Sequence, residues 1–206
     1  MKRIFFLLAM AAFLVSCATV SDYPLTLSYA PKAAGGDEMR KGTIAVPQFV
    51  DKRKVADTRY IGIKNDEARF IALLDDPAAA VSKAVAAYLE SRGYAAGRVN
   101  ERWDGSVQTL KPEWGDRVVG GAVEEFSLTV RSSSLVKMEY VTTVRLFVVY
   151  ADAAAKRILH QERVEASSSY VTVSFNKEKA EELINKALAD AVERALAGAD
   201  DYLLKK

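Results

Sequence analysis

Alternation of apolar and polar residues, typical of half-buried strands, is the clearest pattern along the chain. It predicts five strands, which run over 43–50, 60–64, 118–131, 136–150 and 157–168. Pro47 interrupts the first strand and indicates an edge or a bulge there. The apolar phase changes within the third strand, and Gly120-Gly121 is where we expect the bulge that shifts it. The fourth strand is apolar on both faces, which places it centrally in the sheet.

A spacing of three and four between apolar residues predicts two helices. The first begins at Asp76, whose carboxylate can cap the free amides, with Pro77 at the first helical position and Gly93 at the end. The second covers 177–197 and is capped by Asn176. Each helix has one apolar stripe, so both can cover the same face of a sheet. The predicted fold class is α/β (α+β), a two-layer sandwich in which two helices cover one face of one mixed, mostly antiparallel sheet.

Two stretches lack a clear period and are expected to be loops, 65–76 and 95–116. The second contains both tryptophans of the protein, Trp103 and Trp114. A long loop that carries rigid aromatic rings is a candidate contact surface, because such rings dominate interface energies. The alternative is that both rings cover one end of the sheet.

The N-terminal segment has the composition of an export signal. Lys2 and Arg3 precede an apolar run of about 12 residues, whereas a helix needs roughly 20 to cross a bilayer. Leu14, Val15 and Ser16 then stand before Cys17, the single cysteine. This arrangement resembles the lipobox of bacterial lipoproteins.

The lipobox resemblance implies that Cys17 is acylated and becomes the first residue of the mature protein, so that the membrane is a partner through its acyl chains. More than one chain gives a stable anchor. Ala18 follows in place of an aspartate, which in enterobacterial lipoproteins would retain the protein at the inner membrane, so the outer membrane is favoured. The alternative is an ordinary cleaved signal with Cys17 as an incidental residue.

The chain is therefore divided into a signal peptide (1–16), a lipidated cysteine with a tether (17–42) and a single periplasmic α/β domain (43–206). Glycine and proline interrupt any periodic pattern in the tether. Leu25, Leu27 and Tyr29 alternate within it, which indicates a short edge strand.

Charge and candidate chemistry argue against several functions. The net charge of +2 comes from residues that leave with the signal, and a neutral body does not favour nucleic-acid binding. A lone cysteine excludes intrachain disulfides. His160, the single histidine, lies on a predicted strand, and Glu124 and Glu125 are expected to point to opposite faces. We predict no enzyme, no cofactor and no metal site.

A group of basic residues, Lys52, Arg53 and Lys54, follows the first predicted strand. It is a candidate contact surface for anionic lipid head groups or lipopolysaccharide. The alternative is a solvated hairpin in which nearby aspartates balance the charge.

Several motifs together resemble the YajG-type family of uncharacterised bacterial outer-membrane lipoproteins. They are the lipobox, the strand 43–50 with Asp51-Lys52-Arg53, the pair Ile61-Gly62, the helix end 89–94 and the segment 115–126. The resemblance implies an outer-membrane lipoprotein on the periplasmic face and brings no catalytic residue.

The leading functional hypothesis is a non-enzymatic accessory protein that binds another envelope protein or an envelope component. The alternative is a lipid- or glycolipid-handling accessory of an envelope transport system. That alternative predicts an apolar cavity between the sheet and the helices, with a loop as its lid.

Overall fold

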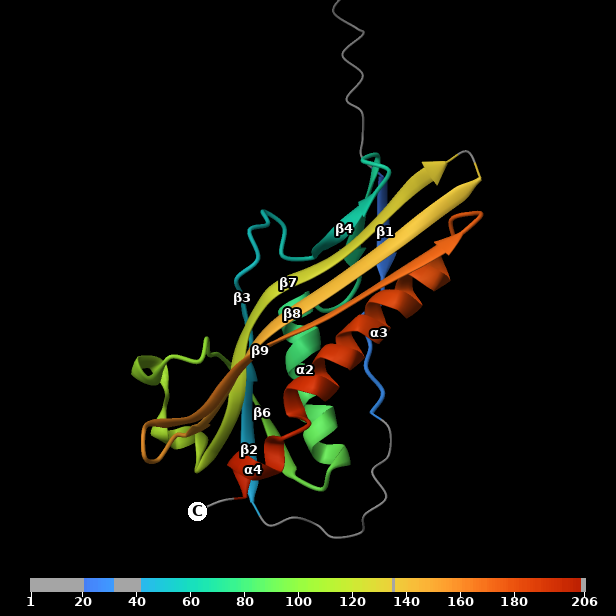
Figure 1. The fold of residues 1–206 in the computed structure, drawn as a ribbon. Coiled ribbons are helices and arrows are strands. Elements are labelled where there is room, and N and C mark those ends of the chain that lie inside the picture. The colour runs from blue at the N-terminus through green and yellow to red at the C-terminus, as the bar shows by residue number, and fades with distance from the viewer. Residues whose placement is uncertain (1–20, 32–41, 135, 205–206) are drawn as a thin grey trace, which may run out of the picture.

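A strongly curved sheet forms one layer of the protein and helices form the other (Figure 1). The computed structural model describes residues 21–31, 42–134 and 136–204. The strands are β1 (Ser21–Leu25), β2 (Thr43–Gln48), β3 (Val50–Asp51), β4 (Tyr60–Lys64), β5 (Ala68–Ala72), β6 (Ala95–Arg102), β7 (Arg117–Ser134), β8 (Lys137–Asp152) and β9 (Arg157–Thr172). The helices are α2 (Pro77–Ser91), α3 (Lys177–Leu196) and α4 (Ala199–Leu203), with 3-10 turns at Val107–Thr109 and Pro112–Trp114.

The long strand β7 organises the sheet. Along one edge it pairs with β8, which pairs with β9, and both pairings are antiparallel. Along its other edge β7 pairs in succession with β2, β3 and β4, all in parallel. Outside these, β6 adds to β2, while β5 and then β1 add to β4. The predicted fold class, a mixed sheet with helices on it, is confirmed, and β8 is central as expected.

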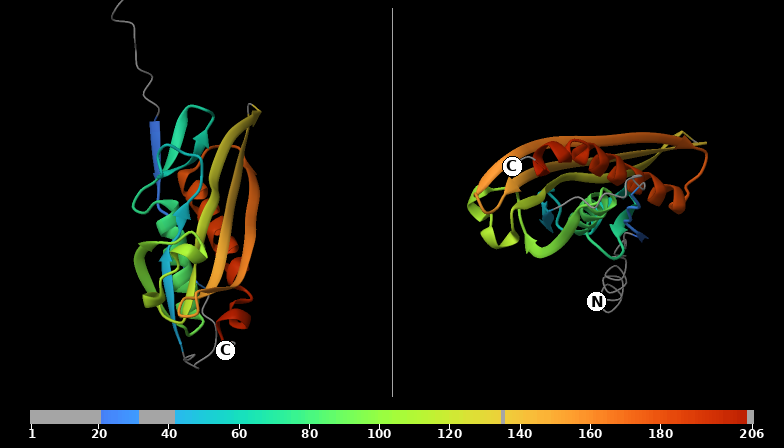
Figure 2. Two further views of the ribbon diagram at one scale, coloured as in Figure 1. Left: turned by 90° about the vertical axis from the view of Figure 1, so that its left-hand side faces the viewer. Right: turned by 90° about the horizontal axis from the view of Figure 1, so that it is seen from below.

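Both long helices lie on the concave face of the sheet, as the end-on view in Figure 2 shows. Each helix begins where its cap predicts: Asp76 Oδ1 accepts a hydrogen bond from Ala79 N at 2.8 Å, and Asn176 Oδ1 accepts one from Lys179 N at 2.6 Å. The apolar stripes of α2 and α3 merge with the inner face of the sheet into one large core. Inside it, the Tyr150 hydroxyl donates to Ala195 O at 2.5 Å and fixes α3 to β8.

The bulge in β7 lies at Glu124, not at Gly120-Gly121 as predicted. The pairing with β8 shifts register between Val123 and Glu125, and this one extra residue accounts for the change in apolar phase. Gly121 has another role: its φ is +143°, and a Cβ there would lie 2.0 Å from Phe147 O. Glycine at 121 lets two strands approach closely.

Pro47 does mark an irregularity, since the register of β2 against β6 shifts between Pro47 and Gln48. The predicted alternative of an edge position is wrong, because β2 lies between β6 and β7.

Two segments predicted as loops contain strands. β5 is a short strand whose buried residues alternate with the partly exposed Arg69 and Ile71, so its mixed sequence has no clear apolar–polar alternation. β6 is an edge strand with mostly exposed, polar side chains, so it has no apolar alternation to reveal it. In both cases backbone pairing with a neighbouring strand, rather than side-chain pattern, determines the structure.

Part of the predicted tether belongs to the folded body. β1 is an edge strand beside β5, and Leu25 is fully buried. The chain then runs along α3, where Asn185 Nδ2 donates to Thr26 O at 2.9 Å and Asn185 Oδ1 accepts from Ser28 N at 3.0 Å. The domain therefore includes 21–31, in addition to residues after 43. The predicted signal peptide, Leu14, Val15, Ser16 and Cys17 lie outside the described residues.

Candidate functional site

The loop with both tryptophans covers the outer face of the sheet. Trp103 is only 1% exposed and lies in a second, smaller core with Leu110 and Val118. Its indole Nε1 donates to Ser106 O at 2.8 Å, and its ring meets Trp114 edge-on with centroids 6.1 Å apart. The alternative given above, that both rings cover one end of the sheet, describes this arrangement. Trp103 is therefore not part of an exposed contact surface.

Close packing explains why the tryptophan lies there. A Cβ at position 120 would be 2.7 Å from Cε3 of Trp103, so Gly120 leaves room for the ring against the sheet. Gly120-Gly121 is the sequence signal for this close packing, but from the sequence alone we interpreted the pair as a bulge.

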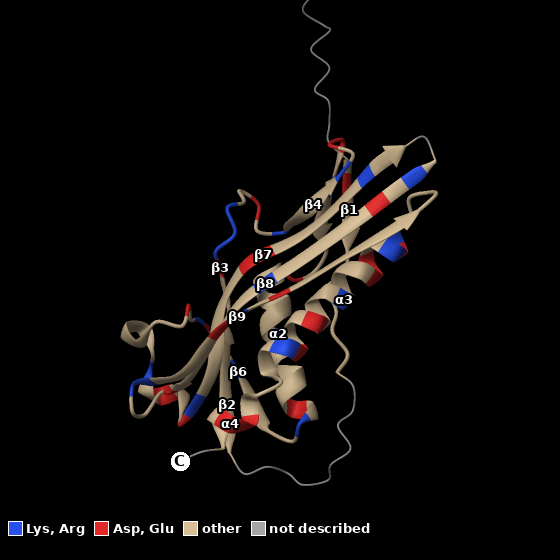
Figure 3. Cartoon of the chain, viewed as in Figure 1, with Lys and Arg blue, Asp and Glu red and all other residues tan. Residues whose placement is uncertain are grey.

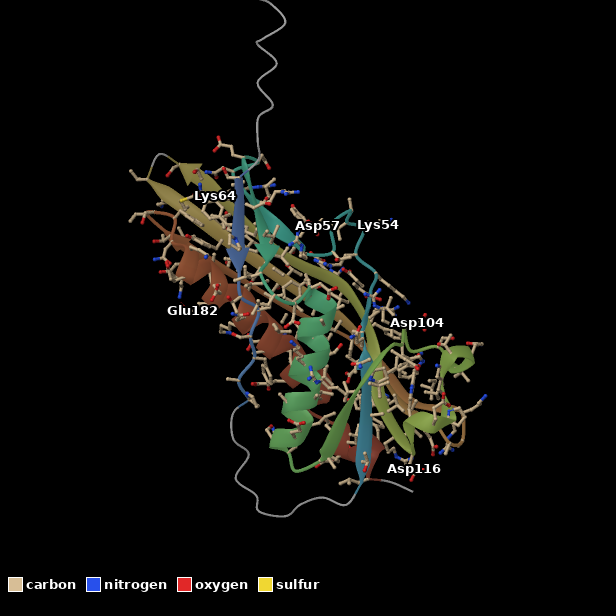
Figure 4. All side chains as sticks on the ribbon, turned by 180° about the vertical axis from the view of Figure 1, so that it is seen from behind. Lys54, Asp57, Lys64, Asp104, Asp116 and Glu182 are labelled. Atoms are coloured by element: carbon tan, nitrogen blue, oxygen red, sulfur yellow. The ribbon has the colours of Figure 1, made fainter. Side chains whose placement is uncertain are left out.

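The basic residues after β3 do not form a single open patch. The Arg53 side chain is 5% exposed and forms an ion pair with Asp51 at 2.7 Å. Lys52 lies 3.7 Å from Asp104 of the tryptophan loop. Figure 4 shows Lys54 on the loop between β3 and β4, whereas Lys64 lies at one end of the sheet beside β1. Arg53 is thus a structural residue, and Lys52 and Lys54 remain candidates for surface contact.

The residues considered for catalysis have structural partners. His160 is half-buried on β9 and its ring stacks on Tyr202, with centroids 4.1 Å apart. Glu124 accepts from Arg163 at 2.9 Å, and Glu125 lies 3.2 Å from Arg145. Within the described ranges there is no group of three or more histidine, cysteine, aspartate or glutamate residues that could hold a metal ion.

Four hollows lined by described residues lie around the sandwich. One of them, about 250 Å³, is formed where α2 and α3 end and α4 begins, and we call this the cavity end. Its lining residues are Tyr88, Arg92, Tyr94, Glu193, Leu196, Ala197, Ala199 and Asp200. The others lie on the outer face of β7 and β8, beside the start of α3, and beside the start of α2. None of these four is the apolar chamber expected for a lipid-handling protein, because core side chains fill the space between the sheet and the helices.

Phenol groups dominate the cavity end. The Tyr94 hydroxyl donates to Asp200, and the guanidinium of Arg92 lies 5.0 Å from the centre of the Tyr88 ring. Nearby, the Tyr29 hydroxyl is buried with no hydrogen-bond partner among the described residues. Burial, followed by the charge of Glu193, raises the pKa of Tyr29 to about 12. The Tyr29 hydroxyl therefore keeps its proton at neutral pH.

The opposite end of the sheet is where the described chain begins. Pairing between neighbouring strands brings four segments to this end, which we call the hairpin end. The pairs that mark it across the sheet are Ser21–Ala68, Ala68–Lys64, Lys64–Val130, Ser132–Met138 and Met138–Thr172. The start of β1, the β4–β5 turn, the β7–β8 turn and the end of β9 therefore lie together (Figure 1).

Comparison with known proteins gives a fold and no family. No protein-family model matches the sequence, and no curated protein matches it significantly. Protein XCC0632 from Xanthomonas campestris, described under the family model DUF330, is similar with a TM-score of 0.56 and 13% identity, over 88% of this chain and 98% of its own.

Two further solved structures are less similar. Hypothetical protein CT253 from Chlamydia trachomatis has a TM-score of 0.46 and 14% identity, over 80% of this chain and 98% of its own. Lipoprotein GNA1162 from Neisseria meningitidis has a TM-score of 0.42 and 15% identity, over 77% and 99%. At these scores neither supports an argument. The resemblance to the YajG-type family stays a hypothesis from the sequence, and the chain shares its fold with the Xanthomonas protein.

Proposed function

We propose that the protein is a lipid-anchored envelope lipoprotein which acts, without catalysis, as a binding or accessory protein on the periplasmic face of the outer membrane. The observation that carries the proposal is Cys17, the single cysteine, placed after Leu14-Val15-Ser16 and an apolar run of signal length. None of the described helices is long and apolar enough to cross a membrane. Attachment through acyl chains needs no such helix.

The position of the folded body supports this proposal. Ser21, the first residue of β1, stands four positions after Cys17 and lies at the hairpin end of the sheet. The domain would thus be held at one defined end, close to the bilayer. Such placement favours a partner in the same membrane or close to it.

The anchor is tested by mass spectrometry of the native protein and of Cys17→Ser. In the native protein the N-terminal peptide is expected to begin at Cys17 and to carry the mass of a diacylglyceryl group and an amide-linked acyl chain. Cys17→Ser is expected to stay uncleaved and to incorporate no labelled fatty acid. An unmodified thiol at position 17 would overturn the proposal.

The binding role is tested by photo-crosslinking in living cells. A photoreactive amino acid is placed at Lys54, Arg98 or Gln161, which are exposed positions on different elements. A reproducible crosslink to one envelope protein or to lipopolysaccharide, from one position and not from the others, is expected. A search over the whole exposed surface that gives no specific product in the envelope fraction contradicts the binding role.

A further inference from the structure

Exposed apolar side chains gather at the hairpin end. Val173 is 77% exposed, Val136 66% and Val171 53%, and we call these three residues the apolar tip. Isolated exposed apolar residues are ordinary, whereas a cluster marks an interaction site. Five of the nine large apolar residues exposed in the described ranges lie in this corner, and they are Val136, Val141, Tyr170, Val171 and Val173.

Strand pairing places the three valines together. Met138 pairs with Thr172, so Val173, the next residue, leaves the sheet beside the β7–β8 turn that contains Val136. Val171 pairs with Glu139 and lies one residue before Thr172 on the same strand end. The tip therefore projects from the ends of β8 and β9, which lie on the other side of β7 from β1.

Aromatic rings join the strand ends that lie near the tip. Phe175 stacks on Tyr140 with centroids 6.3 Å apart and meets Tyr23 of β1 edge-on at 5.2 Å. Tyr170 meets Tyr140 edge-on at 6.2 Å. Because these contacts join β1, β8, β9 and the segment after β9, the start of the chain and the apolar tip belong to one packed unit.

The short span between Cys17 and β1 determines which end of the sheet faces the bilayer. Three residues separate Cys17 from Ser21, so their Cα atoms are four steps apart and at most about 14 Å from each other. An acylated Cys17 therefore holds the hairpin end against the bilayer, with the cavity end directed away. The tip lies at the end that the anchor brings to the lipid.

Charges beside the tip are mixed. Arg131 pairs across the strands with Glu139, and Lys137 begins β8. Figure 3 shows both signs interspersed on the strands and helices, without a basic field at this end. Contact with the bilayer therefore depends on apolar burial rather than on the charge of the lipid head groups.

We infer that Val136, Val171 and Val173 insert into the interfacial layer of the lipid bilayer that carries the anchor. The inference rests on the proposed function, since it needs the anchor at Cys17. The tip has three side chains, whereas a standard protein interface uses roughly 20–30 residues a side, so a lipid surface fits it better than a second copy does. Lipid chains also cover exposed valines without the complementary surface shape that a protein partner would need.

The test uses the acylated full-length protein, in which the Cys17 sulfur is blocked. Val173→Cys and Val136→Cys each then provide the single free thiol, which is labelled with an environment-sensitive fluorophore. The protein is reconstituted in vesicles of phosphatidylethanolamine and phosphatidylglycerol. The label at either position is expected to be quenched by nitroxide lipids and to be at least fivefold less accessible to aqueous iodide than in detergent-free buffer without vesicles.

Leu204→Cys is the matched control, because Leu204 is 48% exposed and belongs to the cavity end. Its label is expected to stay accessible to iodide and insensitive to nitroxide lipids. Replacing phosphatidylglycerol by phosphatidylcholine is expected to leave all values unchanged. The inference is overturned if position 173 is as accessible as position 204 in vesicles, or if protection at 173 appears without lipid together with a dimer.

The same samples separate the two proposals. Mass spectrometry that finds Cys17 acylated while position 173 is in water removes this inference and leaves the anchor. An unacylated Cys17 removes both.

Discussion

At the scale of single residues, Arg53 joins three segments through hydrogen bonds of its guanidinium. It donates to Asp51 at 2.9 and 2.7 Å, to Tyr60 O at 2.6 Å and to Thr58 O at 2.7 Å, and reaches Phe126 O at 3.4 Å. A planar fork with several donors is what such a site needs, so lysine cannot replace it. The side chain fixes the loop between β3 and β4 onto β7.

Arg53→Ala is expected to lower the free energy of unfolding by about 3 kcal/mol, because it leaves the partly buried Asp51 carboxylate without its partner. Urea unfolding measures the change. Arg53→Lys should recover only a small part of it. Arg59→Ala is the control, since Arg59 is 57% exposed and its ion pair with Asp57 spans 3.7 Å, so its loss should cost less than ~0.5 kcal/mol. Equal effects at 53 and 59 would contradict the structural role.

A glycine determines how closely β4 approaches β7. Gly62 has φ of +154°, and a Cβ there would lie 1.8 Å from Leu128 O. Gly62→Ala is expected to destabilise the fold by at least about 2 kcal/mol, because either the backbone or the strand pairing must shift. Gly97→Ala on β6 is the control, since nothing lies within 4 Å of its added Cβ. In thermal unfolding, the melting temperature of Gly62→Ala should be lower than that of Gly97→Ala. A Gly62→Ala protein with the melting temperature of the native one would contradict the β4–β7 register.

Tyr29→Phe is expected to raise the free energy of unfolding by about 1 kcal/mol at pH 7, because a buried hydroxyl without a partner costs free energy. The variant should also resist alkali better. The pKa of Tyr29 is raised to about 12, mainly by burial, whereas an unfolded tyrosine has a pKa near 10. The unfolded state thus loses this proton first, and the stability linked to it is complete below pH 10 and is lost as the pH rises toward 12.

Urea unfolding at pH 8 and at pH 11 checks this prediction. The difference between the two pH values should be smaller in Tyr29→Phe than in the native protein. It should not vanish, because burial also raises the pKa of Tyr150 and of Tyr140. An unchanged pH dependence would show that Tyr29 does not titrate in a buried position.

At the scale of elements, the helices and the three long strands follow from the sequence. Their apolar periods are long, and the caps at Asp76 and Asn176 mark the helix starts with side-chain chemistry that is local in sequence. β5 and β6 do not follow from it, because five mixed residues and an exposed polar edge carry no periodic signal. The burial of Trp103 was equally hidden, since it depends on Gly120 in a distant strand.

Two side chains of α3 hold the segment after β1. Thr26 N donates to Glu181 Oε2 at 2.9 Å, and Asn185 bonds to Thr26 O and Ser28 N. Asn185→Ala removes the last two hydrogen bonds and leaves the one to Glu181. Hydrogen exchange at the Ser28 amide is expected to become about tenfold faster, with a global loss of about 1 kcal/mol. Lys186→Ala, next to it and paired only with Asp190 on the surface, is the control. Equal exchange in both variants would mean that the segment is held by other contacts.

At the scale of the whole molecule, two features would set the orientation of the proposed lipid-anchored protein at a membrane. They are the short span from Cys17 to Ser21 and the position of the apolar tip at the same end of the sheet. The sequence alone predicted the anchor and the sandwich, but it placed a long tether between them. Pairing of β1 with β5 removes most of that tether. Such pairing between segments far apart along the chain has no local pattern and emerges only in the folded sheet.

Lengthening the connection tests this orientation. Twenty glycine and serine residues inserted after Ala18 should leave acylation and folding intact but lower the effective concentration of the tip at the bilayer. The label at Val173→Cys should then become several times more accessible to iodide. Inserting the same sequence in the β3–β4 loop is the control and should change nothing at position 173. Unchanged protection with the long connection would indicate that the tip binds lipid without help from the anchor.

The length of the central strands determines how far the cavity end can lie from the membrane. β8 and β9 each contain 16 residues, and at about 3.3 Å per residue they span roughly 53 Å. If the valines lie in the lipid, these strands separate the membrane from the cavity end, where Arg92, Glu193 and Asp200 line a hollow. A component bound there would be held some 50 Å above its membrane, at a height fixed by backbone hydrogen bonds rather than by a flexible stalk.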